Sequence, residues 1–211
     1  DFRTSPSVLP RAARTNYGLP SDAFVFSAFH RAEKIEPESF DLWMRVLEKV
    51  PDSVLWLYAD EGRMRENIRR EASQRGVQPR RLVFAAREPR AAYLARFPLA
   101  DLQLDSLQHN ATTTACDAFS VGVPMLTLHG GTFTSRIGES LLRAAGLPDL
   151  VAPNKEEFVS LAAQLASDPA RLENHRRTLA ARTGPLFDTA GRVRELKDAL
   201  LQMWRQHADR R

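Results

Sequence analysis

The sequence contains a single cysteine and no long apolar stretch. Cys116 has no possible partner, which excludes a disulfide within the chain and is compatible with a reducing compartment. No segment approaches the roughly 18–20 consecutive apolar residues that a membrane-spanning helix requires. These two absences lead us to expect a cytoplasmic protein that does not cross a membrane.

Several common site motifs are missing as well. The chain has no Gly-x-Gly-x-x-Gly fingerprint and no Walker lysine, which argues against binding of dinucleotides or ATP by those loops. The histidines do not have the spacing of metal ligands, and there is no cysteine cluster. We therefore expect neither a metal nor a bound cofactor.

Charge of one sign does not dominate the chain. The 30 Lys and Arg residues are mixed with 26 Asp and Glu residues, which leaves a net charge of +4. A mildly basic, mixed surface is not a nucleic-acid-binding tract, although it suits a ligand that carries phosphate. The length of 211 residues, 43% of them hydrophobic, is sufficient for a buried core.

The beginning of the chain lacks a recognisable element. The first residues do not form a signal peptide, there is no initiator methionine, and nothing before Ala23 has the pattern of a folded segment. We expect a fragment of a longer protein, in which residues 1–20 are a linker from a missing N-terminal part. Residues 21–211 are then expected to form the folded domain.

From Ala23 onward, short apolar strands alternate with helical patterns. Such alternation predicts a parallel sheet covered on both faces, that is, a doubly wound, Rossmann-like α/β domain. Strands are expected at residues 23–29, 53–58, 81–85, 101–104 and 124–128. Helices are expected at about residues 37–50, 62–75, 89–96, 134–145, 155–167, 169–182 and 190–207, and another follows the threonine run described next.

Three threonines, Thr112, Thr113 and Thr114, stand where the fourth strand gives way to a helix. Backbone N–H groups at a helix N-terminus favour anions, and Asp117 lies about one turn further on, within reach of a sugar hydroxyl. These features suit phosphate and ribose. The alternative is that one threonine only caps the helix.

Two other segments are expected at the same edge of the sheet. They follow the first strand, at residues 30–34, and the third strand, at residues 87–90. Ligands of doubly wound sheets bind at the carboxyl ends of the strands, so this convergence is itself an argument for a site.

The order and spacing of many short segments resemble those of protein O-GlcNAc transferases and the related SPINDLY-type enzymes. The likeness covers nearly the whole chain from Tyr17 onward. It rests on residues 17–20, 29–37, 42–43, 50–57, 99–101, 104–105, 110–117, 122–127, 130, 135–136, 146–147 and 185–188.

What the resemblance implies is specific. These enzymes are GT-B glycosyltransferases of family 41 type that follow a tetratricopeptide repeat array and transfer GlcNAc from UDP-GlcNAc to Ser or Thr hydroxyls of proteins without a metal. The chain is similar to the C-terminal, nucleotide-sugar-binding half of their catalytic region. Its partners are then the missing N-terminal catalytic half, the repeats and the protein acceptor, with neither nucleic acid nor membrane. The fragment alone is expected to be inactive.

The resemblance also suggests roles for single residues. Lys34 matches the catalytic cation on the diphosphate, and Thr113 and Thr114, within the segment that begins at Asn110, match residues that touch the phosphates. Asp117 and Arg90 match ribose-binding residues, and Tyr93 matches a ring that stacks on uracil. The alternatives are a surface lysine for Lys34, a helix charge for Asp117 and a core side chain for Tyr93.

Two positions depart from the family pattern. Thr112 replaces a histidine, and Arg31 replaces a glutamine in the segment before Lys34. Arg31 is a candidate for phosphate binding or for obstruction of the sugar position, and His30 or His109 is a candidate substitute for the missing imidazole. The departures leave two alternatives open: another donor such as GDP-fucose, or a catalytically degenerate nucleotide-binding or protein-interaction module.

Overall fold

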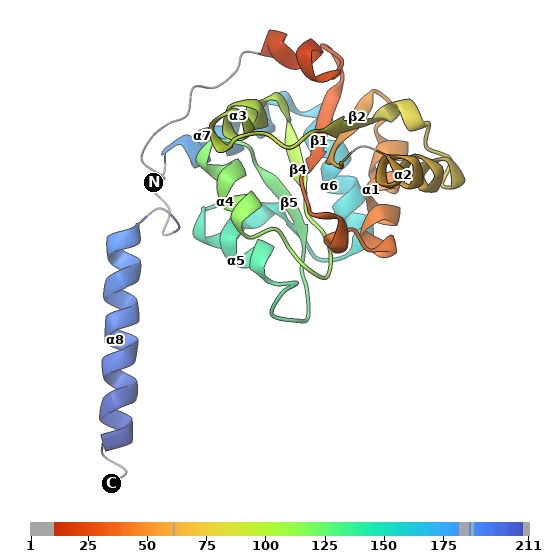
Figure 1. The fold of residues 1–211 in the computed structure, drawn as a ribbon. Helices are drawn as coiled ribbons and strands as arrows, with labels where there is room; N and C mark the ends of the chain where they lie inside the picture. Colours follow the sequence, from red (N-terminus) through yellow and green to blue (C-terminus); the bar gives the residue numbers. More distant parts are fainter. Residues whose placement is uncertain (1–10, 61, 182–185, 187, 209–211) are drawn as a thin grey trace.

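Strands that are all parallel form one sheet in the computed structural model, which describes residues 11–60, 62–181, 186 and 188–208 (Figure 1). Their bounds are β1 Phe24–Ala28, β2 Ser53–Tyr58, β3 Leu82–Ala85, β4 Leu102–Leu104, β5 Met125–Leu128 and β6 Val151–Ala152. Their order is β3-β2-β1-β4-β5-β6, and each neighbouring pair is parallel. This is the doubly wound order of a Rossmann-like sheet, as predicted.

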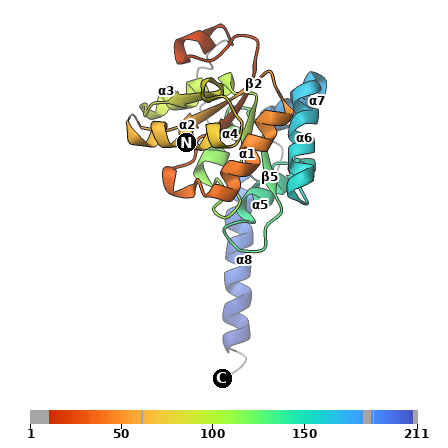
Figure 2. The ribbon, with the colours of Figure 1, turned by 90° about the vertical axis from the view of Figure 1, so that its right-hand side faces the viewer.

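Helices cover both faces of the sheet. Figure 1 shows α3, α4 and α5 on one face and α1, α2 and α6 on the other, and α1 packs on α6 (Figure 2). The α-helices are α1 Pro37–Lys49, α2 Arg63–Gln74, α3 Arg90–Arg96, α4 Thr113–Ser120, α5 Ile137–Ala144, α6 Lys155–Ser167, α7 Pro169–Ala181 and α8 Thr189–Ala208. Short 3-10 helices are η1 Arg11–Tyr17, η2 Ala32–Lys34, η3 Pro79–Arg81, η4 Phe97–Leu99 and η5 Pro148–Leu150.

Coverage of both faces explains why the central strands are almost uniformly apolar. Val25 and Phe26 in β1, and Leu55, Trp56 and Leu57 in β2, are fully buried. Such continuous runs are typical of parallel strands that lie between two helical layers. The strands and helices predicted from the sequence are confirmed, and their ends shift by up to about three residues.

The segment before β1 corrects the prediction that nothing before Ala23 is folded. Residues 11–17 form η1, in which Arg14 is buried and forms an ion pair of 2.7 Å with Asp101, the residue before β4. Leu19 joins the core. Residues 11–19 thus pack on the domain, and the boundary at residue 20 stays a prediction, while residues 1–10, Arg182, Pro185 and Phe187 lie outside the described residues.

Helix α8 projects away from the sheet (Figures 1 and 2). The sequence predicts an apolar stripe on this helix, and an exposed patch wherever its packing partner is absent. The structure confirms the patch, because Val193, Leu196, Leu200, Met203 and Trp204 are all more than half exposed.

Candidate functional site

The neighbouring strands β1 and β4 mark the switch point of the sheet, from which the chain winds in opposite directions. Doubly wound sheets bind their ligands in the crevice outside this point. The segment after β1 carries Lys34, and the segment after β4 carries Asn110. The Lys34 ammonium donates a hydrogen bond of 3.1 Å to the Asn110 carbonyl oxygen. The predicted convergence of these two segments is therefore confirmed.

The Asn110 side chain is buried and forms its hydrogen bonds within the fold. The residue is only 2% exposed. Its amide nitrogen donates to the Ser106 carbonyl at 2.6 Å, and its amide oxygen accepts from the Gly138 N–H at 3.0 Å. The side chain thus joins the loop after β4 to the start of α5 and leaves the carbonyl oxygen to position Lys34.

The buried Asp105 side chain holds the loop between β4 and α4 in place through hydrogen bonds. One carboxylate oxygen accepts the N–H groups of Ser106 and Ala111 at 2.9 and 2.7 Å, and the other accepts the Thr127 hydroxyl at 2.8 Å. Burial raises the pKa of Asp105 to about 7, against the effect of these donors. Because Ala111 directly precedes the threonine run, Asp105 fixes the approach to α4.

His30 lies beneath this loop and is buried. Its Nε2 donates to the Leu104 carbonyl at 3.0 Å, and its ring stacks on Trp43. Burial lowers the pKa of His30 to about 4, so the ring is neutral at pH 7. A neutral, buried ring does not supply a cation to phosphate. The structure therefore favours a structural role for His30, while His109 lies on the surface.

The threonine run stands at the N-terminus of helix α4. Thr112 occupies the N-cap position, and its side chain makes no capping hydrogen bond. Thr112 thus stands where the capping alternative places it, but its hydroxyl is not used to cap the helix. Thr112 and Thr113 are exposed, and the first-turn N–H groups of a helix have no partners within it. Donors and the positive end of the helix dipole thus face outward beside Lys34.

Arg90 and Asp117, both predicted to bind ribose, contact each other. The guanidinium of Arg90 donates two hydrogen bonds to the Asp117 carboxylate, at 2.9 and 2.7 Å. The Asp117 side chain is 4% exposed and that of Arg90 is 60% exposed. The segment after β3 therefore joins the other two at this edge, as predicted. The buried carboxylate orients an arginine that remains open to solvent.

Tyr93 packs against the hydrophobic core and also lines a cavity. Its ring centroid lies 5.4 Å from that of Phe97 and 6.3 Å from that of Phe29, and the Arg96 guanidinium lies 5.6 Å from it. Burial raises the pKa of the Tyr93 phenol above its usual value. A cavity of about 620 Å³ at the carboxyl ends of β1, β2 and β3 is lined by Tyr93 and also by Arg31.

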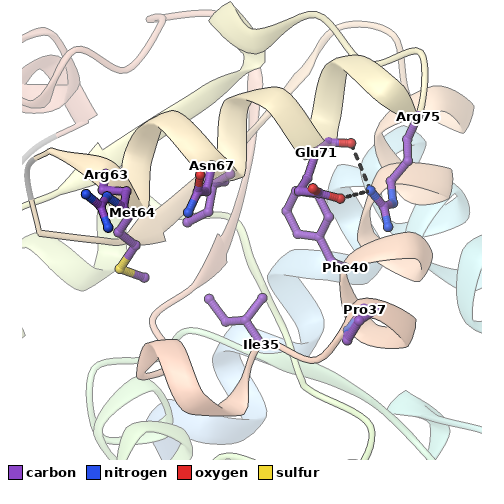
Figure 3. Close-up of a pocket in the computed structure, with 9 residues that line it drawn as sticks. Ile35, Pro37, Phe40, Arg63, Met64, Asn67, Glu71 and Arg75 are labelled. Atoms are coloured by element: carbon purple, nitrogen blue, oxygen red, sulfur yellow. Dashed lines mark hydrogen bonds and ion pairs between the residues drawn. The ribbon is translucent and has the colours of Figure 1, made fainter.

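Arg31 is exposed at the rim of this cavity, where it forms an ion pair of 2.6 Å with Glu33. Its guanidinium is thus already partnered by a carboxylate on the same short segment. A second cavity, of about 570 Å³, lies between α2 and the start of α1 and is mainly apolar (Figure 3). Ile35, Phe40 and Met64 line it, and none of the residues predicted for the site does.

Comparison with known proteins identifies the family. The sequence model described as Glycosyl transferase family 41 matches residues 3–196. The chain belongs to this family.

Curated relatives from family 41 include UDP-N-acetylglucosamine–peptide N-acetylglucosaminyltransferase of Caenorhabditis elegans, 36% identical over 96% of this chain and 18% of that protein. A probable SPINDLY protein of Petunia hybrida, carrying the same transferase name, is 35% identical over 96% of this chain and 22% of that protein. The chain therefore spans about a fifth of the length of the curated relatives it matches.

Solved structures support the same assignment. An O-GlcNAc transferase mutant of Thermobaculum terrenum has a TM-score of 0.83 and 32% identity, and the match covers 95% of this chain and 39% of that one. The Anabaena protein HepE, solved with UDP, has a TM-score of 0.65 at 15% identity, which shows the fold alone. The predicted fold class, that of the C-terminal domain of GT-B glycosyltransferases, is confirmed.

Two residues of this chain that shape the site, Asp105 and Glu88, were not predicted from the sequence. Asp105 directly follows an apolar strand, which is a recognisable signal, but its hydrogen-bond partners lie up to 22 residues away in sequence. Glu88 stands two residues before Arg90 and lines the larger cavity. Their importance depends on burial and on pairing, which the sequence does not display.

Within the described part of this family 41 chain, no group of His, Cys, Asp or Glu residues is arranged to hold a metal ion. None of the described helices combines the length and the apolar character that crossing a bilayer requires. That the reaction needs no metal stays a prediction.

Proposed function

We propose that this chain is the nucleotide-sugar-binding half of a glycosyltransferase that moves GlcNAc from UDP-GlcNAc to Ser or Thr hydroxyls of proteins. The observation that carries the proposal is the hydrogen bond between Lys34 and the Asn110 carbonyl. It fixes an ammonium group beside the open N-terminus of α4, at the switch point of the sheet. The names of the relatives supply the donor and the acceptor class.

The proposed chemistry follows from where charge develops. As the bond between the anomeric carbon and the diphosphate oxygen breaks, the departing UDP gains negative charge. The Lys34 ammonium, the N–H groups at the start of α4 and the Thr113 and Thr114 hydroxyls are placed to stabilise that charge. Groups that are already oriented need little reorganisation during the reaction.

The remaining site residues are proposed to hold the rest of the donor. Arg90, oriented by Asp117, faces the ribose, and Tyr93 presents its ring to uracil. Thr112 and Arg31 are proposed to line the donor site, and Asn110 supports Lys34. The acceptor site and any general base belong to the N-terminal catalytic half, with which this chain and the tetratricopeptide repeats are proposed to act in the cytoplasm.

A transfer assay on the protein with both catalytic halves present tests the proposal. We expect Lys34→Ala to lower kcat about 100-fold or more, as loss of a preorganised charge-stabilising donor does. Lys49→Ala makes the same change of charge at the exposed end of α1, which leads into the amino end of β2, and is expected to leave kcat unchanged. Equal activity of Lys34→Ala and the unaltered protein would refute the proposed role of the lysine.

The alternative is a module that binds nucleotide without transferring sugar. The exposed Arg31, already paired with Glu33, and a threonine in place of the family's histidine at position 112 favour it. This alternative predicts that the protein binds UDP but gives no transfer in that assay, even when the N-terminal half is present. The fragment alone is expected to be inactive under both readings, so only the two-half protein discriminates between them.

A further inference from the structure

The apolar cavity between α2 and the start of α1 is not used by the proposed donor site. It has a volume of about 570 Å³, and side chains of α2 face those of residues 35–40 across it (Figure 3). Ile35, Phe40 and Met64 give it an apolar lining, and Arg63 and Asn67 of α2 also border it. A concave, mainly apolar site of this size with a few polar groups is typical of binding pockets.

The walls of the apolar cavity are held in place at one end. Phe40 is 5% exposed, and the Arg75 guanidinium lies over its ring, 5.4 Å from the centroid. Arg75 donates a hydrogen bond of 2.7 Å to the Glu71 carboxylate and forms an ion pair with Asp41. These contacts connect the end of α2 to α1. A pocket that is formed before binding avoids much of the cost of ordering its side chains.

The apolar cavity adjoins the proposed donor site. Ile35 directly follows Lys34 in the chain, and Met64 lines both this cavity and the 620 Å³ cavity beside Tyr93. Under the proposed function the acceptor protein approaches the sugar next to Lys34. An extended chain spans at most about 3.3–3.6 Å per residue, so a residue four positions from the modified hydroxyl reaches up to roughly 14 Å from it. The acceptor is therefore the molecule that the proposed reaction brings to this opening.

The surface around the apolar cavity is basic. Helix α2 carries four arginines and two glutamates. Arg63 is exposed and has no ion-pair partner among the residues that the structure describes. Complementary charges steer association, and like charges disfavour it. An occupant with an apolar side chain and acidic neighbours therefore fits this surface.

The same charges argue against a second copy of this chain as the occupant. The exposed apolar stripe of α8 is the part of a second copy with the apolar side chains to fill such a cavity. Yet α8 carries four Lys and Arg residues against two Asp and Glu residues, so α8 and α2 are both basic. An acidic acceptor segment meets no such repulsion.

We propose that the apolar cavity between α2 and α1 binds the acceptor protein at a distance from the modified hydroxyl, taking an apolar side chain that is flanked by acidic residues. The inference rests on the proposed function, because it requires an acceptor beside Lys34. The site of the hydroxyl itself stays with the N-terminal catalytic half. The cavity adds a second contact, which selects among acceptor sequences.

Transfer from UDP-GlcNAc to short peptides, measured on the protein with both catalytic halves, tests the inference. Each peptide has one serine in a glycine-rich sequence and a Leu-Glu-Glu element four residues before or after it. A partner peptide has alanine in place of the leucine. In one of the two orders, kcat/KM is expected to be about tenfold higher for the leucine peptide, which corresponds to about 1.4 kcal/mol. The difference should lie in the KM for the peptide.

Asn67→Trp places a large side chain at the border of the cavity and should bring this ratio close to one, with transfer to the alanine peptide unchanged. Asn174→Trp is the matched control, since it makes the same substitution at an exposed position of α7 outside the cavity, and it should keep the tenfold ratio. Each ratio compares two peptides on one variant, so a partly unfolded preparation does not alter it.

Arg63→Glu tests the acidic part of the proposed sequence. It should raise the KM of the Leu-Glu-Glu peptide and lower that of a Leu-Lys-Lys peptide. Arg70→Glu makes the same change of charge on α2 at an exposed position that does not line the cavity, and its effect should be much smaller. Equal effects of the two variants would overturn the acidic preference.

Equal kcat/KM for the leucine and alanine peptides in the unaltered protein would overturn the inference, as would an undiminished ratio in Asn67→Trp. Loss of transfer to every peptide in Asn67→Trp, but not in Asn174→Trp, would also overturn it, because the cavity would then hold the N-terminal half. Failure of the proposed function looks different: no peptide is modified, or UDP binds with no dependence on Lys34, and the inference falls with it. Lys34-dependent transfer without preference for leucine overturns the inference alone.

Discussion

Asp105 shows how much of this site depends on a single buried side chain. Its carboxylate joins β4, the loop before α4 and β5 through three hydrogen bonds. Buried polar groups are tolerated when their partners are complete, and loss of one partner costs about 1–3 kcal/mol for each group left unsatisfied. Asp105 is therefore a positioning residue, which acts on the ligand only through the loop that it holds.

The raised pKa of Asp105 predicts an unusual dependence of stability on pH. Its pKa is about 7 in the folded chain, against an ordinary pKa of 3.8 for an aspartate in the unfolded chain. Between these pH values the folded chain keeps a proton that the unfolded chain has lost, so the contribution of Asp105 to stability falls as pH rises from about 4 to about 7.

Thermal unfolding of the unaltered protein and of Asp105→Asn at several pH values measures this contribution. The difference in Tm should move in favour of the asparagine variant as pH rises through this window and level off above pH 7. Titrating groups distant from Asp105 act on both proteins and cancel in the difference, whereas His30, whose Nε2 lies 4.0 Å from Asp105 Oδ1, does not. A difference in Tm that stays constant from pH 4 to pH 7 would show that Asp105 does not titrate as described.

Gly138, at the start of α5, packs so closely that no side chain fits. A Cβ atom there would lie 2.4 Å from an oxygen of Asp105 and 2.6 Å from the Thr127 hydroxyl. We expect Gly138→Ala to displace Asp105, to lower stability by about 1–3 kcal/mol as overpacking does, and to weaken UDP binding. Gly131→Ala is the matched control, because a Cβ atom there meets nothing within 4 Å. Chemical denaturation of both variants decides, and equal stability would contradict the described packing.

At the scale of secondary structure, the sequence predicts repeated apolar strands well and isolated contacts poorly. β2 and α6 match the predicted bounds because apolar periodicity and turn residues mark both ends of each. β6 consists of only two residues, too few for a pattern. η1 was missed because its burial depends on Asp101, 87 residues from Arg14.

The same limit applies to the candidate site. Its location at the carboxyl edge follows from topology, and the contacts of Lys34 with Asn110 and of Arg90 with Asp117 confirm that the predicted segments meet. The sequence does not show which of these residues are open to a ligand and which only support the fold. Asn110 and His30 resemble ligand contacts in sequence, and only burial shows that both belong to the fold.

Helix α8 offers a test at the same scale. Trp43 and Trp56 are fully buried, whereas Trp204 on α8 is 69% exposed. Acrylamide should therefore quench mainly Trp204 in this chain, and Trp204→Phe should remove most of the quenchable fluorescence. In the protein with the proposed N-terminal catalytic half the same residue should become protected, because the apolar stripe is then expected to pack on that half. Unchanged quenching after Trp204→Phe would contradict the exposed position of α8.

At the scale of the whole molecule, the fold brings three distant segments to one edge of a parallel sheet. The strand order places the segments after β1 and β4 on the two sides of the switch point, and α3 places Arg90 and Tyr93 next to them. The result is a cation, a helix N-terminus and an aromatic side chain at the same edge of the sheet. The central claim is that this edge binds the diphosphate of a nucleotide sugar through Lys34.

Calorimetric titration of the protein with UDP, repeated with Lys34→Ala and Lys49→Ala, tests this claim most directly. The account predicts that Lys34→Ala weakens UDP binding at least about tenfold, or about 1.4 kcal/mol, and that Lys49→Ala binds as the unaltered protein does. Equal UDP affinity in all three proteins, or no UDP binding by any of them, would contradict the account.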